Sequence, residues 1–113
     1  MRILRSREDF WEVTARVHNE AFAFDTESDG PQLIKGNMLN VHRSRLVGFS
    51  IAFMEEGDTF YVPYRHGGEP NRETIDLLKA VGSTSREVWA HNWKHDATVL
   101  KREGVEPPKN ARD

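Results

Sequence analysis

The chain contains no cysteine among its 113 residues. Disulfide bonds and thiolate zinc sites are therefore excluded, and a reducing compartment is compatible with this composition. No apolar run approaches the roughly 20 residues that a membrane-spanning helix needs, and no signal-peptide pattern opens the chain. We therefore expect a cytoplasmic protein that has no membrane partner.

A strong charge of either sign is also missing. The chain has 16 lysines and arginines against 18 aspartates and glutamates, which gives a formal net charge of −2. No global basic field therefore attracts nucleic acid, which argues against a stand-alone, high-affinity DNA-binding protein. An enzyme that holds nucleic acid mainly through metal ions remains compatible with this balance. The length predicts a single domain over residues 1–113.

Hydrophobic periodicity divides the chain into alternating strands and helices. Ser6, Asn71 and Asn92 are suited to cap a helix N-terminus, and apolar residues at helical spacing follow each of them. We expect helices over residues 7–17, from Asn71 to Gly82, and from Asn92 to Gly104. The predicted strands are residues 2–5, 20–26, 46–54, 59–64 and 87–90. Residues 28–45 are expected to form a long loop, and residues 109–113 a structureless tail.

This order of elements predicts a mixed sheet with helices packed on it. The strands at 46–54 and 59–64 form an antiparallel hairpin, and the first of them runs antiparallel to strand 20–26. The strand at 87–90 follows a helix, so it can return parallel to strand 20–26. The fold class is therefore α/β or α+β. We expect the three tryptophans, Trp11, Trp89 and Trp93, in the core.

The stretch from Ala21 to Gly30 joins a buried strand to two acids. Four apolar residues run directly into Asp25, Thr26 and Glu27, and an unbroken run of this kind suits a strand buried on both faces. Asp25 and Glu27 share one face of such a strand and repel each other there. A divalent cation such as Mg²⁺, which prefers oxygen ligands, would relieve that repulsion. A strand end that simply reaches water is the alternative.

A further acid opens the last predicted helix. Asn92 and Asp96 are four residues apart and therefore share a helix face. If strand 87–90 lies beside strand 20–26, Asp96 approaches Asp25 and Glu27. Three carboxylates at one point suit a site in which two cations assist phosphodiester cleavage. Taken alone, Asn92 and Asp96 are better explained as a helix cap and a first-turn acid.

These segments resemble the 3′–5′ exonuclease (proofreading) domain of family A DNA polymerases, the bacterial polymerase I type. The stretch Phe22–Asp29 looks like the first exonuclease motif, and Asn92–Asp96 looks like the second. Between them, Leu46–Phe53 resembles the strand after the first motif, and Tyr61–His66 resembles the next strand and its loop. The likeness is collinear and covers residues 18–108.

The resemblance implies a ribonuclease-H-like, DnaQ-like fold that is incomplete at its C-terminal end. It implies a hydrolase that acts on the 3′ end of single-stranded DNA and depends on Mg²⁺ or Mn²⁺, with two cation sites in the complete family fold. By the resemblance, Asp25 would bind both cations. Glu27 would hold one cation and the attacking water, and Asp96 would hold the second cation.

The same resemblance implies three substrate-binding residues. Thr26 and Asn92 would contact the terminal nucleotide or its 3′-hydroxyl group. Family members usually carry a leucine wedge shortly after the first motif. Pro31 occupies that place here, and Leu33 is the residue expected to substitute for the wedge.

The family's third motif, which supplies a tyrosine and a further aspartate, is missing from the chain. Arg112-Asp113 resembles the start of the strand that leads toward that motif. We therefore expect a fragment, a split gene product or an N-terminal piece of a phage replication polymerase, with weak or no cleavage by itself. The alternative is a non-catalytic module that docks to the remainder of a polymerase. An unpaired sheet edge or an exposed apolar face would then allow a homodimer.

Overall fold

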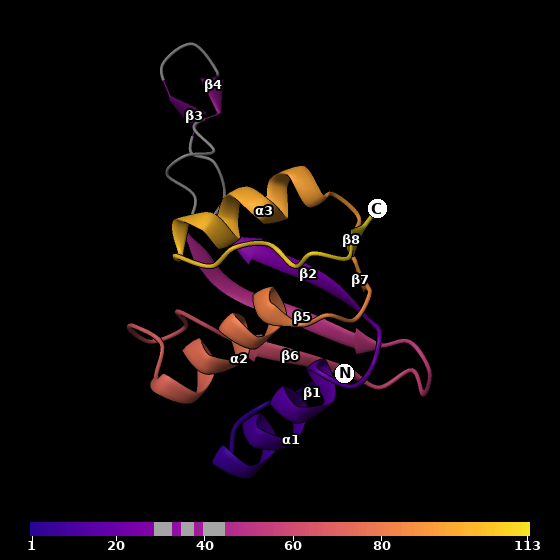
Figure 1. Cartoon of the computed structure of the whole chain (residues 1–113). Helices are drawn as coiled ribbons and strands as arrows, with labels where there is room; N and C mark the ends of the chain where they lie inside the picture. Colours follow the sequence, from indigo (N-terminus) through magenta and orange to yellow (C-terminus); the bar gives the residue numbers. More distant parts are fainter. Residues whose placement is uncertain (29–32, 35–37, 40–44) are drawn as a thin grey trace.

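The computed structural model describes residues 1–28 and 45–113, together with the backbone of residues 33–34 and 38–39 (Figure 1). Its main sheet contains six strands in the order β1-β6-β5-β2-β7-β8. Their bounds are Arg2–Ile3 (β1), Thr59–Pro63 (β6), Leu46–Phe53 (β5), Phe22–Ser28 (β2), Val88–Trp89 (β7) and Ala111–Arg112 (β8). The helices are Arg7–Val17 (α1), Arg72–Ser83 (α2) and Trp93–Arg102 (α3).

The strand pairings confirm the predicted mixed sheet. β5 pairs antiparallel with both β2 and β6, and β7 pairs parallel with β2. Two parts of the prediction were wrong. Residues 28–45 contain a short antiparallel pair of strands, β3 (Leu33–Ile34) and β4 (Met38–Leu39). Residues 109–113 are no structureless tail, because β8 pairs in parallel with β7 and extends the sheet.

All three predicted helix caps are present. The side-chain oxygens of Ser6, Asn71 and Asn92 accept the backbone N–H groups of the third residues beyond them, at 3.1, 2.9 and 3.3 Å. Each bond satisfies one of the amide donors that a helix leaves unpaired at its first turn. Gly82 does not end α2 as predicted, because the helix continues to Ser83.

The core lies on one face of the sheet. Phe22, Phe24 and Thr26 of β2 lie opposite Phe53, Ile51 and Phe49 of β5, and the aromatic and aliphatic members of this set are buried together with apolar residues from all three helices. On the other face, Ala23, Asp25 and Glu27 are partly or largely exposed in the described part of the chain. The expectation that this strand is buried on both faces was therefore wrong.

Two of the three tryptophans differ from the expectation. Trp93 is buried and stacks on Phe24, with ring centroids 6.1 Å apart. Trp89 is half-buried, and Trp11 is 60% exposed at the surface of α1, where the Arg7 guanidinium lies over its ring. Among the described residues, no helix has both the length and the apolar composition needed to cross a membrane.

Candidate active site

The two acids of β2 lie inside the strand and point to its open face. Asp25 is opposite Ser50 of β5, and Glu27 is opposite Gly48. Both carboxylates are exposed. The prediction that they share one face is confirmed, because residues two apart in a strand point the same way. β2 continues to Ser28, so the predicted end at residue 26 was too early.

Asp96 in the first turn of α3 meets the same part of β2. The residue is only 2% exposed, and its Oδ1 accepts a 2.5 Å hydrogen bond from the Thr26 hydroxyl. Burial raises the pKa of the Asp96 carboxyl; the bonds from Thr26 oppose that shift, and the negative charge of Asp25 adds to it. The structure thus brings Asp96 close enough to Asp25 for the two carboxylates to repel, which is one part of the predicted cluster of three acids.

Glu27 is held by a residue to which sequence reasoning gave no role. The Tyr61 hydroxyl of β6 donates to Glu27 Oε1 at 3.0 Å, and the same hydroxyl lies 2.8 Å from His66 Nε2. Burial, together with the bond and the charge of Glu27, raises the pKa of Tyr61 to about 12. The one residue in the sequence that reflects this contact is the glycine at position 48. A β-carbon there would lie 2.0 Å from the Tyr61 hydroxyl oxygen, so a larger residue would displace the phenol.

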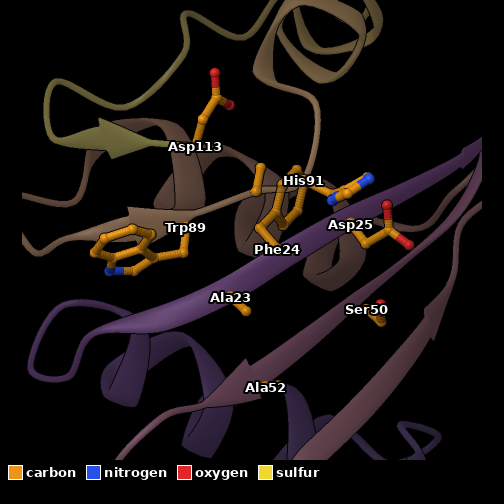
Figure 2. A pocket seen from close by; sticks show the side chains of 9 residues that line it. Ala23, Phe24, Asp25, Ser50, Ala52, Trp89, His91 and Asp113 are labelled. Atoms are coloured by element: carbon orange, nitrogen blue, oxygen red, sulfur yellow. The ribbon is translucent and has the colours of Figure 1, made fainter.

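A cavity of about 460 Å³ opens on the exposed face of the sheet beside these acids (Figure 2). Its lining includes Ala23 and Asp25 of β2, Ser50 and Ala52 of β5, and Trp89, His91 and Asp113 from the other side. In Figure 2 the imidazole of His91 and the carboxylate of Asp25 lie at the same end of the cavity, and Trp89 lies at the other. The cavity thus combines a floor of small side chains with carboxylates at its edge.

Asp113 helps to position the first turn of α3. Its Oδ1 accepts the backbone N–H of Trp93 at 3.1 Å, which satisfies a second amide at the start of the helix that carries Asp96. An anion near a helix N-terminus is also favoured by the helix dipole. A residue expected in a structureless tail therefore lines the cavity and braces the helix.

The structure describes the side chains of two of the three predicted substrate-binding residues. Thr26 directs its hydroxyl to Asp96, and Asn92 caps α3 while also lining a second cavity of about 270 Å³ with Lys94, His95 and Thr98. The side chain of Leu33 lies outside the described residues. The roles of all three toward a substrate stay predictions.

The acids fit a divalent cation in chemistry and in part in arrangement. Asp25, Glu27 and Asp96 offer only oxygen donors, which Mg²⁺ and Mn²⁺ prefer, and a cation would offset the repulsion between Asp25 and Asp96. Within the described ranges, no three His, Asp or Glu side chains converge as ligands of one ion. The third carboxylate is that of Glu27, two residues along β2 from Asp25. It accepts the hydrogen bond from Tyr61 of β6.

No protein-family model and no curated protein sequence matches the chain. Solved structures do match it along nearly its whole length. RNase D from Trypanosoma brucei in complex with RNA U12 matches with a TM-score of 0.68 and 14% identity, over 97% of this chain and 36% of that one. Escherichia coli RNase D, described as an exoribonuclease involved in structured RNA processing, matches with a TM-score of 0.65 and 15% identity, over 97% and 26%.

The exonuclease domain of EXD2, soaked in manganese and GMP, also matches, with a TM-score of 0.57 and 13% identity over 97% of this chain and 53% of that one. The chain therefore has the ribonuclease-H-like fold of DnaQ-like 3′–5′ exonucleases, as the sequence predicted. It spans only 26 to 53% of the length of these three structures. They give no support to the polymerase context that the sequence resemblance implied.

Proposed function

We propose that this chain carries the metal-dependent site of a 3′–5′ exonuclease, which removes nucleotides from the 3′ end of single-stranded nucleic acid. The observation that supports it most is the meeting of β2 with α3, where Asp96 is buried beside Asp25 and their charges repel. Two carboxylates that repel each other destabilise a fold unless a cation bound between them offsets their charges, so such a pair indicates a functional site. The likeness to exonuclease structures supports the same fold for this chain.

Asp25, Glu27 and Asp96 are the residues that would hold Mg²⁺ or Mn²⁺, whose positive charge serves to polarise water and the scissile phosphodiester. The Thr26 hydroxyl keeps the Asp96 carboxylate oriented. Asp25 is exposed beside the cavity and is therefore accessible to a nucleic-acid end. Because bare carboxylates repel a phosphodiester, cleavage by this site should require the added cation.

Two observations bear on the substrate, and one favours DNA whereas the other favours RNA. The motif resemblance favours a single-stranded DNA 3′ end in a polymerase, with Thr26 and Asn92 at the terminal nucleotide. The Trypanosoma brucei RNase D structure contains RNA. We take DNA as the proposed substrate, and RNA of the same sequence is the comparison that decides the choice.

Digestion of 5′-labelled single strands with Mg²⁺ or Mn²⁺ tests the proposal. We expect slow 3′ shortening that stops with a chelator. Asp96→Asn should lower the rate by more than about 100-fold, since loss of a ligand should exceed the cost of losing an outer-shell partner. Asp76→Asn, which changes an exposed aspartate of α2, is the matched control and should cleave at the wild-type rate. Equal residual cleavage by the two variants would rule out the site.

A second candidate function is association through the open face of the sheet. The partly exposed side chains of Ala23, Ala52 and Trp89 line its cavity, and apolar surface of this kind favours a second copy of the chain. Size-exclusion chromatography with light scattering should then show a dimer that Ala52→Glu dissociates. A monomer at high concentration would exclude it.

A further inference from the structure

The Glu27 carboxylate is bound by a side chain from two strands away. Glu27 lies opposite Gly48 of β5, and Gly48 lies opposite Pro63 of β6. Neighbouring strands are about 4.8 Å apart, and Tyr61 of β6 reaches over the intervening strand to donate to Glu27 Oε1 at 3.0 Å. A β-carbon on Gly48 would lie 2.0 Å from the Tyr61 hydroxyl oxygen. The glycine therefore provides the space that this contact needs.

The Glu27 carboxylate fixes the direction of both hydrogen bonds of Tyr61. A phenol has one proton to donate, and an ionised carboxylate can only accept. With the phenol proton given to Glu27, the bond of 2.8 Å to His66 requires Nε2 to be the donor. The two rings also meet edge to face, with centroids 5.7 Å apart. The three side chains form a chain of hydrogen bonds that runs from His66 through Tyr61 to Glu27.

The loop that carries His66 is fastened at the preceding residue. Arg65 Nη1 donates to the Leu46 carbonyl oxygen at 2.9 Å and to Glu103 Oε2 at 2.7 Å, and its Nη2 donates to Glu103 Oε1 at 2.8 Å. The Glu103 side chain is only 9% exposed, and a bidentate, charge-assisted pair of this kind is strong and directional. β5 and the end of α3 therefore set the position from which His66 reaches Tyr61.

We propose that Tyr61 is the positioning residue for Glu27. It occupies one oxygen of the carboxylate and limits the rotation of the side chain, which leaves the other oxygen as the one available to a cation. This inference rests on the proposed exonuclease function, in which Glu27 is a metal ligand. Carboxylates that bind metals are themselves commonly held by outer hydrogen bonds, and loss of such a bond typically costs about 10- to 100-fold in metal affinity or activity.

Titration calorimetry with Mn²⁺ alone tests the positioning role. Tyr61→Phe removes one oxygen atom and should weaken Mn²⁺ binding about tenfold. Gly48→Ala should have a similar effect although it retains the phenol, because the new β-carbon displaces the hydroxyl. Tyr64→Phe is the matched control: it removes the hydroxyl of the chain's other tyrosine and should bind Mn²⁺ as the wild type does.

Steady-state cleavage adds a readout that a merely structural role would not give. Tyr61→Phe should lower kcat about tenfold and leave KM for the nucleic acid unchanged, since Tyr61 acts through Glu27 and not on the substrate. A general loss of folding would instead lower the amount of active protein, which the thermal unfolding profile reports.

A measurement without metal separates this inference from the proposed function. Three-bond NMR couplings of Glu27 should report one dominant χ1 rotamer in the wild type and averaged rotamers in Tyr61→Phe. Unchanged couplings and Mn²⁺ affinity in the variant, with an active wild type, would overturn the positioning role alone. If the couplings are averaged in Tyr61→Phe but the wild type binds no Mn²⁺, Tyr61 orients Glu27 without serving a metal. That result would overturn the proposed function, and with it the role of Tyr61 toward a metal.

Discussion

Replacing Thr26 with valine tests the bond that joins α3 to the central strand. The substitution keeps the shape of the side chain and removes the hydroxyl that donates to Asp96 at 2.5 Å. Hydrogen bonds to charged groups contribute about 1.5–3 kcal/mol to stability. Asp96 is 2% exposed, so bulk water cannot readily replace the lost donor. We expect the free energy of unfolding to fall by about 2 kcal/mol at neutral pH.

The expected change in melting temperature follows from the size of the chain. An unfolding entropy of about 2.1 cal/mol/K per residue, applied to 113 residues, gives about 0.24 kcal/mol/K. A loss of about 2 kcal/mol therefore lowers Tm by about 8 °C. A valine that merely cost a generic neutral hydrogen bond, about 1 kcal/mol, would lower it by about 4 °C.

The loss should also depend on pH. Burial raises the pKa of Asp96 in the folded protein, so this carboxyl lowers stability as the pH rises through that raised pKa, and its contribution is most favourable in acid. The Thr26 hydroxyl opposes the shift because it stabilises the ionised form. The difference between wild type and Thr26→Val should therefore be largest where Asp96 is ionised and should shrink as the acid is protonated.

Urea unfolding at neutral and acidic pH, in the wild-type and Asp96→Asn backgrounds, measures both effects. With Asp96→Asn present, Thr26→Val should cost only about 1 kcal/mol, because a neutral amide oxygen then accepts the bond. The reasoning is refuted if Thr26→Val costs the same in both backgrounds and at both pH values.

Two further substitutions test contacts elsewhere. Gly82→Ala adds a β-carbon 2.5 Å from the Glu106 carbonyl oxygen. The clash should outweigh the roughly 1 kcal/mol of helix propensity gained and lower the free energy of unfolding by about 1–2 kcal/mol in urea; a more stable variant would contradict it. In a Tyr64→Phe background, Glu27→Gln should lower the pKa of Tyr61 from about 12, because burial remains but the negative charge of Glu27 is lost and only a neutral amide oxygen accepts the bond. Phenolate absorbance after a pH jump measures this shift, and an unmoved pKa would argue against the bond.

The helix starts were predictable because capping is a local interaction. Ser6, Asn71 and Asn92 each bond an amide three residues ahead, and no distant part of the chain is needed to make that bond. Gly82 shows the limit of the same approach. Glycine commonly follows a helix, but here it is required inside α2 by the backbone of Glu106, a long-range contact that local rules do not contain.

The burial of β2 was misjudged for a reason visible in its residues. Alanine counts as apolar in a run such as Ala21-Phe22-Ala23-Phe24, but it buries little surface. The large side chains Phe22 and Phe24 alternate with small ones, which is the pattern of a strand buried on one face. Counting Ala23 as equal to a phenylalanine concealed that alternation.

The carboxylates of the site were predictable, and the contacts that hold them were not. Asp25 and Glu27 share a face by strand geometry alone, and Asp96 approaches Asp25 because β7 pairs beside β2. The bond from Tyr61 to Glu27 depends on the register of three strands and on the space over Gly48. Neither quantity follows from hydrophobic periodicity.

The hydrogen bond from the Trp93 amide to Asp113 has a practical consequence for anyone who purifies this protein. An affinity handle joined directly to residue 113 would begin at the side of the cavity, next to the carboxylate that braces the turn carrying Asp96. β1 forms the opposite border of the sheet, and Met1 is 82% exposed. A handle placed before Met1 would leave the acids undisturbed, so assays should use protein tagged at its amino end.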